Sequence, residues 1–352
     1  AGVVVALLVV AGGWYYFLND PQPITQSKVV KIGVIGPYTG PLAQYGEAHR
    51  NGFIMAAEDL GADKNNVQFI YEDSAYDTAK AVSAFRKLTT VDKVDLVIDW
   101  GSASSYGIAP LAKDAGVPFI AISIDPDTVK ASNYVFRDNP SPDDIADTLW
   151  KHFRQKGYKN VSIVNLKLLY FDKIVASLQK LKSADETVTI VDTYQSFGDN
   201  DFRTSISKLK TASVQPDVLG VFLAGGQIAQ FYKQADQLGL KVPTFGTDFF
   251  ESYSEIADAN GLMTGAVYAH MGTSDQFVAD YKARFDTDNQ ISYAGLSYDL
   301  GRILMTDVDF TDATSVIDSL KAIKNYPGSI GTYSYSDANG DRYLKPTLYI
   351  KE

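Results

Sequence analysis

The sequence contains no cysteine and only three histidines among its 352 residues. The absence of cysteine excludes disulfide bonds, thiolate metal ligands, a cysteine nucleophile and a lipid-modified N-terminal cysteine. His49, His152 and His270 lie far apart in the sequence, so they offer little to a multi-histidine metal site. We therefore expect no metal and no other cofactor.

Positive charge is also in short supply, since the formal net charge is −10. A nucleic-acid backbone or an anionic membrane surface would in general be repelled by such a chain. A neutral or cationic small ligand fits the charge better. Hydrophobic residues make up 45% of the chain, which is enough for a large core, and the length favours two domains.

The first 18 residues contain no charged side chain, and the breakers Asn-Asp-Pro-Gln-Pro follow at 19–23. This pattern predicts an export segment, whose length is at the lower end of the roughly 17 to 25 residues that span a bilayer. Trp14, Tyr15 and Tyr16 would form an interfacial belt. We find no convincing small-x-small cleavage site, so an uncleaved membrane anchor is favoured over a signal peptide. Residues 1–27 are assigned to this segment and its linker.

From Lys28 onward, β-branched runs alternate with amphipathic stretches, and the alternation starts again after residues 138–142. Alternation of this kind is typical of βαβ units and a mostly parallel sheet. The fold class is therefore α/β with two lobes, each a mostly parallel sheet flanked by helices. The predicted strands are 29–35, 67–71, 94–98, 118–122, 161–165, 188–192, 218–223 and 244–246. The predicted helices are 78–90, 107–115, one ending near 155, 172–182, 202–211 and 227–238. Residues 271–324 are predicted to be mainly helical, and 331–350 to form strands joined at Asn339-Gly340.

The loop at 38–46, between the first strand and the first helix, carries hydroxyls, an amide and an aromatic ring. Phe53, Ala56, Ala57 and Leu60 form one apolar face of the helix that follows. Because open α/β sheets bind ligands at the carboxyl ends of their strands, this loop is a candidate ligand site.

A set of short motifs resembles one known family. They are Lys-Ile-Gly-Val-Ile-Gly at 31–36, Thr-Gly-Pro-Leu-Ala-Gln-Tyr-Gly at 39–46, Asn-Gly at 51–52, Tyr-Glu-Asp-Ser at 71–74, Ser-Ala-Ser-Ser at 102–105, Gly-Val-Pro at 116–118 and Asp-Phe at 201–202. With the length and the order of strands, they resemble the solute-binding proteins of ABC transporters of the branched-chain amino acid and amide type, leucine-binding-protein-like, with the type I periplasmic-binding fold.

The resemblance implies an extracytoplasmic monomer, in the periplasm or at the cell surface. It would capture a small amino acid or amide between its lobes and present it to an ABC permease, without catalysis and without nucleic acid. It also implies three hinge crossovers, near Asn139, His270 and Gly331. Lobe 1 would then comprise 28–139 and 271–330, and lobe 2 would comprise 140–270 and 331–352.

The ligand residues implied by the resemblance fall into two groups. Ser102, with Ser104 in the same loop, would serve the ligand carboxylate, while Ser123, Asp125 and Asp248 would serve the ammonium. Helix capping by Ser102 and a turn role for Asp125 ahead of a proline are the alternative interpretations.

Two aromatic residues complete the implied site. Tyr45 would pack against the ligand side chain and Tyr170 would close over the ligand. Ala-Gly-Gly at 224–226 stands where many relatives have an aromatic residue, which leaves a roomier pocket unless Phe249 or Phe250 fills it.

Asp125 replaces a small hydroxyl residue that is usual in the family. It adds a negative charge that an aliphatic amino acid does not need. Either the ligand carries an extra donor or positive charge, or Asp125 points away from the cleft.

Other functions match the sequence less well. Ser102 lacks the glycine two residues later that a serine hydrolase's nucleophile elbow requires, and neither a dinucleotide-binding motif nor a Walker loop is present. A ligand-sensing receptor with the same fold remains open, because sensor and transport receptor share the binding module.

Overall fold

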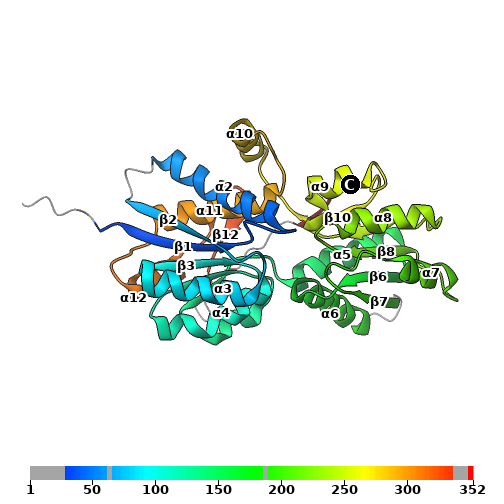
Figure 1. Ribbon diagram of the computed structural model, residues 1–352, viewed down its shortest axis with the longest axis horizontal. Helices are drawn as coiled ribbons and strands as arrows, with labels where there is room; N and C mark the ends of the chain where they lie inside the picture. Colours follow the sequence, from blue (N-terminus) through cyan, green and yellow to red (C-terminus); the bar gives the residue numbers. More distant parts are fainter. Residues whose placement is uncertain (1–27, 62–65, 185–188, 336–347, 352) are drawn as a thin grey trace, which may run out of the picture.

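The computed structural model describes residues 28–61, 66–184, 189–335 and 348–351, and the structural statements below concern these residues. They form two sheets flanked by helices and lying side by side as two lobes (Figure 1). The first sheet has five parallel strands in the order β2-β1-β3-β4-β5. Its strands are β1 (Val30–Gly36), β2 (Val67–Asp73), β3 (Leu96–Trp100), β4 (Phe119–Ile122) and β5 (Val135–Arg137).

Strands at the centre of this sheet are apolar over nearly their whole length because helices cover both of its faces. Every residue of β3 and β4 is buried, as expected for parallel strands covered on two sides. The helices that follow the strands are α2 (Ala43–Leu60), α3 (Thr78–Lys87) with a π turn η2 (Leu88–Asp92), α4 (Ser102–Ala115) and the 3₁₀ turn η3 (Pro126–Ala131).

The second sheet has six strands in the order β13-β10-β9-β8-β6-β7, and all its pairings are parallel except the one between β10 and β13. The strands are β6 (Asn160–Leu166), β7 (Thr189–Gln195), β8 (Val218–Phe222), β9 (Thr244–Gly246), β10 (Val267–Met271) and β13 (Leu348–Lys351). Its helices are α5 (Pro142–Lys156), α6 (Leu169–Ala184), α7 (Arg203–Thr211), α8 (Gln227–Gln237), α9 (Tyr253–Ala259) and the 3₁₀ turn η4 (Asp248–Glu251).

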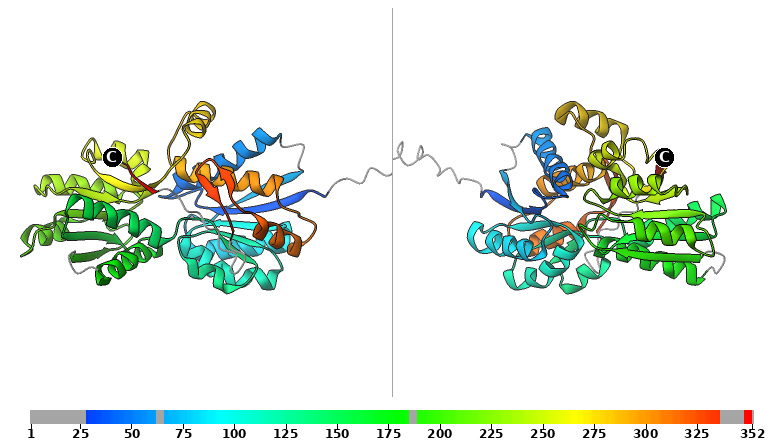
Figure 2. Two further views of the ribbon diagram at one scale, coloured as in Figure 1. Left: turned by 180° about the vertical axis from the view of Figure 1, so that it is seen from behind. Right: turned by 45° about the vertical axis from the view of Figure 1, so that its right-hand side comes forward.

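After β10 the chain returns to the first sheet through α10 (Asp275–Phe285), α11 (Ile291–Thr306) and α12 (Ala313–Ala322). Helix α11 packs along α2, and glycines at the contact allow a close approach. A Cβ on Gly52 would meet the carbonyl oxygen of Ala294, and one on Gly301 would lie 2.9 Å from Ala56 Cβ. Figure 2 shows from behind that the last helices and the orange hairpin lie against the first sheet.

The end of the chain corrects one sequence prediction. Strand β12 (Gly331–Tyr333) pairs with β11 (Tyr326–Gly328) and not with the second sheet. The Tyr335 ring packs on Phe136 of the first sheet at 5.5 Å. The chain therefore does not cross to the second lobe near Gly331, although β13 does pair there. The predicted turn at Asn339-Gly340 lies outside the described residues.

Two helices begin earlier than the sequence predicts, and both shifts affect the site. Helix α4 starts at Ser102 instead of residue 107, and α6 starts at Leu169 instead of residue 172. Ser102 and Tyr170 are thus residues of first helical turns. The short strands β5 and β10 were not predicted.

The predicted export segment lies outside the described residues. Within the described part of the chain, no helix is both long and apolar enough to cross a membrane. The same residues contain no grouping of three acidic or histidine side chains that could hold a metal ion.

Candidate functional site

The loops at the carboxyl ends of the strands bring the two lobes into contact. Pro41, after β1, lies against the glycine-rich loop after β8, where a Cβ on Gly225 would be 3.2 Å from it. Gln44 of α2 donates a hydrogen bond to the Ser252 hydroxyl at 2.7 Å. The candidate site therefore lies between the lobes, at the sheet edge where α/β proteins bind ligands.

Aromatic side chains from both lobes meet at this place. The Tyr45 ring lies 5.3 Å from Trp100, 4.9 Å from Phe249 and 5.8 Å from Tyr293, between ring centroids. Phe249 also contacts Tyr170 at 5.4 Å. We call these five residues the aromatic cluster. All are buried.

Phe249 and Phe250 are the rings that could fill the space beside the small residues at 224–226. Phe249 comes from the second lobe and packs beside Tyr45. Phe250 instead packs on Tyr232 and Tyr268, at 6.3 and 6.0 Å. The ring next to the glycines is that of Phe197, which a Cβ on Gly225 would meet at 3.1 Å.

Asp248 lies next to the aromatic cluster, at the start of η4. The Tyr170 hydroxyl donates a hydrogen bond to its Oδ1 at 2.5 Å, whereas Oδ2 has no hydrogen-bond partner among the described residues. Burial raises the pKa of Asp248 to about 6, and the bond from Tyr170 opposes that rise. A buried carboxylate with a free oxygen can accept a donor from a ligand.

Ser102 stands at the first position of α4, after Gly101 in a positive-φ conformation (148°). Its hydroxyl oxygen accepts a hydrogen bond from the Ile124 N–H at 3.2 Å. Ser102 therefore links the loops after β3 and β4 beside a helix N-terminus, where backbone N–H groups favour an anion.

Ser104 has a different set of partners. Its hydroxyl donates to Asp99 Oδ2 at 2.7 Å, and the Ser105 hydroxyl donates to the same oxygen at 2.7 Å. Burial raises the pKa of Asp99 to about 7, and these two hydroxyls oppose the rise. The ligand contact predicted for Ser104 would compete with the bond it already makes to Asp99.

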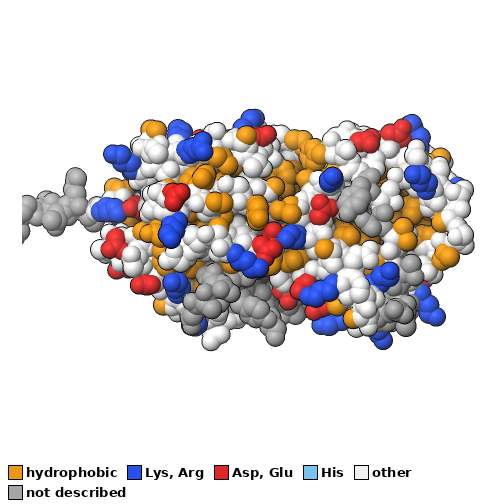
Figure 3. Space-filling view, turned by 90° about the horizontal axis from the view of Figure 1, so that it is seen from below, with side chains coloured by type: hydrophobic (Ala, Val, Ile, Leu, Met, Phe, Trp, Pro, Cys, Tyr) orange, Lys and Arg blue, Asp and Glu red, His pale blue; other side chains and the backbone are white. Residues whose placement is uncertain are grey.

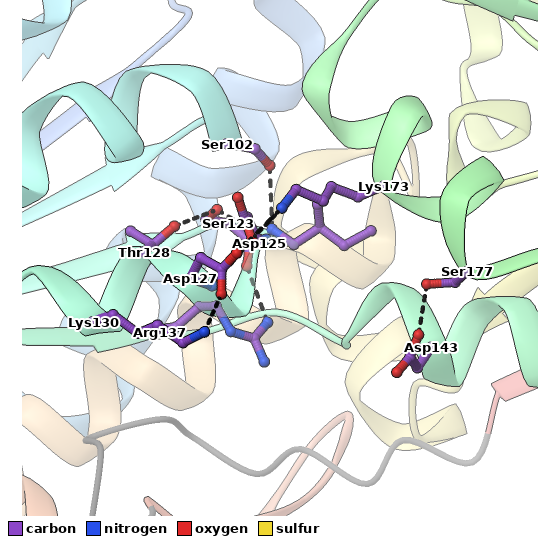
Figure 4. Close-up of polar contacts among 11 residues, drawn as sticks. Ser102, Ser123, Asp125, Asp127, Thr128, Lys130, Arg137, Asp143, Lys173 and Ser177 are labelled. Atoms are coloured by element: carbon purple, nitrogen blue, oxygen red, sulfur yellow. Dashed lines mark hydrogen bonds and ion pairs between the residues drawn. The ribbon is translucent and has the colours of Figure 1, made fainter. Parts of the chain in front are cut away.

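The loop after β4 forms a polar network (Figure 4). The Asp125 N–H donates to the Ser123 hydroxyl at 3.2 Å, and Asp125 Oδ1 accepts from the Asp127 N–H at 3.0 Å. The same carboxylate forms an ion pair with Lys173 Nζ of α6 at 2.9 Å. Arg137 donates to the Ser123 carbonyl at 3.1 Å. Asp125 thus has both a turn role and a cation partner from the other lobe.

The predicted residues therefore separate into two clusters. Tyr45, Tyr170 and Asp248 gather in or beside the aromatic cluster, while Ser102, Ser123 and Asp125 belong to the network around the loop after β4. Sequence reasoning missed Trp100, Tyr293 and Lys173. Lys173 could have been noticed, because it lies three residues after Tyr170 on the same helix face. No sequence motif pointed to Trp100 or Tyr293.

Little free space remains between the lobes at this point. A cavity bordered by Tyr170, Asp248 and Tyr293 offers about 10 Å³ to the centres of water molecules. That is room for about one water. A ligand the size of an amino acid can enter only if the lobes or the aromatic rings move.

The N-terminus of α8, beside the loop at 224–226, is already occupied by an acid. Glu255 accepts hydrogen bonds from the N–H groups of Gly226 and Ala229, at 2.6 and 2.8 Å. A ligand carboxylate would be repelled there. The N-terminus of α4 is the better place for a negative group.

Comparison with known proteins gives one family. A family model described as "Periplasmic binding protein" matches residues 29–348. A leucine-, isoleucine-, valine-, threonine- and alanine-binding protein of Pseudomonas aeruginosa is 28% identical over 229 residues, which are 62% of this chain and 60% of that protein. A Leu/Ile/Val-binding protein of Escherichia coli K12 is 27% identical over 247 residues, 66% of each chain. The chain thus spans somewhat less than two thirds of these relatives.

Solved structures share the fold over most of their length. A leucine-binding protein, LivK, from Thermotoga maritima superposes with a TM-score of 0.80 at 21% identity, covering 92% of this chain and 98% of that one. A solute-binding protein of an ABC transporter from R. palustris, in complex with benzoate, gives a TM-score of 0.81 at 22% identity, covering 92% and 93%.

Proposed function

Because the chain belongs to the periplasmic binding protein family, we propose that it is the substrate-binding protein of an ABC importer and captures a small amino-acid-like solute. As a member of this family it is a solute-binding protein and not an enzyme. Its place is extracytoplasmic. The proposed partner is an ABC permease, to which the protein presents its solute as a monomer.

Asp248 is the observation that supports an amino acid best. Its carboxylate is buried, and one oxygen has no partner among the described residues. An ammonium group on the ligand would satisfy that oxygen and compensate the charge. A benzoate, as bound by the R. palustris protein, carries no positive charge and would place a second anion near Asp248.

The ligand carboxylate is proposed to bind at the N-terminus of α4, beside Ser102. The helix dipole and its free N–H groups favour a negative charge there. The aromatic cluster would surround the apolar part of the ligand. Trp100 adds a buried indole N–H that has no hydrogen-bond partner among the described residues and can serve a ligand oxygen.

We propose that the lobes move as two bodies about the crossovers. The first would contain 28–139 and 271–335, and the second 140–270 and 348–351. The narrow space between Tyr170, Asp248 and Tyr293 supports this, because a solute could enter only an opened cleft. Closure would then bury it and complete its hydrogen bonds.

The surface supports a small molecule as the partner in the cleft. In Figure 3, Lys and Arg side chains are interspersed with Asp and Glu across the face shown, without a broad basic area. A nucleic-acid backbone would therefore find no broad basic area on this face, and the net charge of −10 also disfavours such a partner.

Calorimetry with leucine, isoleucine, glutamine and benzoate tests the proposal. We expect at least one amino acid or amide to bind and benzoate not to bind. Mass spectrometry of molecules released from the purified protein would identify the natural solute. Tight binding of benzoate without any amino acid would refute the proposed ligand class.

Membrane attachment through residues 1–18 remains a separate proposal. It is supported by their uncharged sequence alone. Fractionation of cells, with the mass of the intact protein, tests it. A mature N-terminus between residues 13 and 27 would exclude the anchor.

A further inference from the structure

Lys173 is a charged residue for which the proposed function has no role, although it reaches from one lobe to the other. We propose that Lys173 and Asp125 form an inter-lobe ion pair that closes one side of the cleft and makes it select ligands without a net positive charge. This inference rests on the proposed function for the ligand and on the geometry below for the pair.

The two residues come from opposite sides of the cleft. Asp125 follows β4 of the first sheet, and Lys173 is the fifth residue of α6 in the second lobe. Nζ is 2.9 Å from Asp125 Oδ1, a distance at which a direct ion pair forms. Figure 4 shows the lysine reaching across to the loop.

Helix α6 carries a residue of the proposed ammonium site and a residue of the ion pair. Tyr170 and Lys173 are three positions apart and therefore lie on one face. Tyr170 bonds to Asp248 within the second lobe, beside the aromatic cluster, while Lys173 pairs with Asp125 of the first lobe. The start of α6 thus borders both the proposed ammonium site and the inter-lobe ion pair.

The neighbouring charges leave Asp125 dependent on Lys173. Asp127 is 46% exposed in its side chain and pairs with Lys130 at 2.5 Å, and its contact to Lys173 is longer, at 3.6 Å. Asp125, by contrast, has a side chain only 3% exposed. A carboxylate so buried needs a cation, because an uncompensated buried charge is strongly unfavourable.

Charge balance then sets the ligand class. With Lys173 in place, the pair is neutral, and Asp248 is the acid left to meet the ligand ammonium. A zwitterionic amino acid is balanced by Asp248 and the N-terminus of α4. A second positive charge, as in arginine, would find its carboxylate already taken by Lys173. Without the lysine, Asp125 would be free to attract such a ligand.

The helix also supplies a matched control. Lys180 lies two turns further along α6 and pairs with Asp143 of α5 at 3.4 Å, within the second lobe. Both of those side chains are exposed, 75% and 59%. Lys180→Met removes the same charge from the same helix, and from the rim of the same hollow, but leaves the ion pair of Asp125 with Lys173 in place.

The experiment measures leucine and arginine binding by calorimetry for the wild type, Lys173→Met, Asp125→Asn, the double variant and Lys180→Met. We expect Lys173→Met to weaken leucine binding roughly tenfold, which is less than the usual loss for a stranded buried partner, because the lysine is partly exposed. The same variant should reduce the difference between the affinities for leucine and arginine. The double variant should recover most of the leucine affinity, and Lys180→Met should match the wild type.

Melting temperatures, measured both without ligand and with saturating leucine, test the ion pair independently. Loss of Lys173 should lower the melting temperature more in the wild type than in Asp125→Asn, which is the non-additivity expected of a direct pair. If the wild type binds neither amino acid, the proposed function fails. The melting temperatures of the wild type, the two single variants and the double variant still show whether Lys173 and Asp125 form an ion pair. Additive melting shifts, or a Lys173→Met variant that binds both ligands as Lys180→Met does, would overturn the proposal.

Discussion

Buried carboxylates dominate the chemistry of this protein at the residue scale. Asp99, Asp125 and Asp248 are each at most 5% exposed, yet their surroundings differ. Serine hydroxyls donate to Asp99 Oδ2, Lys173 compensates the charge of Asp125, and Tyr170 donates to Asp248 Oδ1. Among the described residues, Asp99 Oδ1 and Asp248 Oδ2 both have no hydrogen-bond partner. What distinguishes Asp248 is its place beside the aromatic cluster, where the two lobes meet.

Asp99→Asn should stabilise the protein at high pH. Because the pKa of Asp99 is raised from 3.8 to about 7 in the folded state, folding favours the protonated form, and the wild type loses stability as pH rises between those values. The amide can still accept from Ser104 and Ser105. Thermal melts near pH 8 should show a gain of about 1 to 4 kcal/mol for the variant, since one unit of pKa corresponds to about 1.4 kcal/mol. Near pH 4 the two proteins should be equal, and a gain of the same size there would contradict this account.

Asp248→Ala should remove most of the affinity for an amino acid. The ligand ammonium would lose its buried counter-charge, at a cost of about 2 to 5 kcal/mol of binding free energy by calorimetry. Asp236→Ala, on the exposed side of α8, is the control and should bind as the wild type. Equal affinity in Asp248→Ala and the wild type would remove Asp248 from the site.

The same residue predicts a pH dependence of binding. Since the pKa of Asp248 without ligand is raised to about 6, the carboxylate becomes protonated as pH falls through that value. A neutral acid cannot compensate an ammonium, so amino acid affinity should fall below about pH 6. Asp248→Asn should bind weakly at every pH and show no such inflection.

How far the sequence could predict the site depends on which residues are considered. Tyr45, Tyr170 and Asp248 were named from motif position, and the structure brings them together, although no ligand contact is yet tested. Tyr293 comes from a helix that no motif marked, and Lys173 lies on the helix of Tyr170 but was not itself part of a motif. Their contacts depend on how the lobes pack, which residue type and spacing do not encode.

At the scale of elements, β-branched runs predicted where most strands lie. The sequence pattern did not predict where helices α4 and α6 begin. Helix α4 begins at Ser102, a residue of modest helix propensity, whereas α6 begins at Leu169, a strong helix former that the apolar spacing did not assign to the helix. Strands β5 and β10 are short and were not marked by a long apolar run. The pairing of β12 with β11 depends on a long-range arrangement that a local pattern cannot reveal.

Gly52→Ala should destabilise the protein through the α2 and α11 contact. The added methyl group would overlap the Ala294 carbonyl, and the helices must move apart. We expect a loss of about 1 to 3 kcal/mol in the free energy of unfolding by denaturant titration. Gly107→Ala is the control, because its methyl group would meet a threonine methyl group at 3.1 Å, a milder contact than the one with the Ala294 carbonyl, and alanine is the better helix former. A variant at Gly52 as stable as this control would contradict the packing argument.

At the scale of the whole molecule, the lack of cysteine makes the lobes easy to label. Val91 and Val214 are exposed, 70% and 61%, and lie on the first and second lobe. Cysteines placed at both positions would be the only thiols in the chain. Adding a bound amino acid should narrow and shift the distance distribution between spin labels there, because closure is expected to accompany binding. An unchanged distribution at saturating ligand would exclude lobe closure.

The interleaved path of the chain also governs when it can fold. Helix α2 near the beginning packs on α11 near the end, and β10 pairs with the terminal strand β13. A nascent chain growing from its N-terminus therefore completes neither core until synthesis is almost finished, and contacts so distant in sequence form slowly. Until then the side of α2 that packs on α11, around Gly52, is uncovered, although Phe53 can already pack on Phe69 of β2. Such a chain stays unfolded through most of its synthesis, which is the form in which a secretion channel accepts a protein.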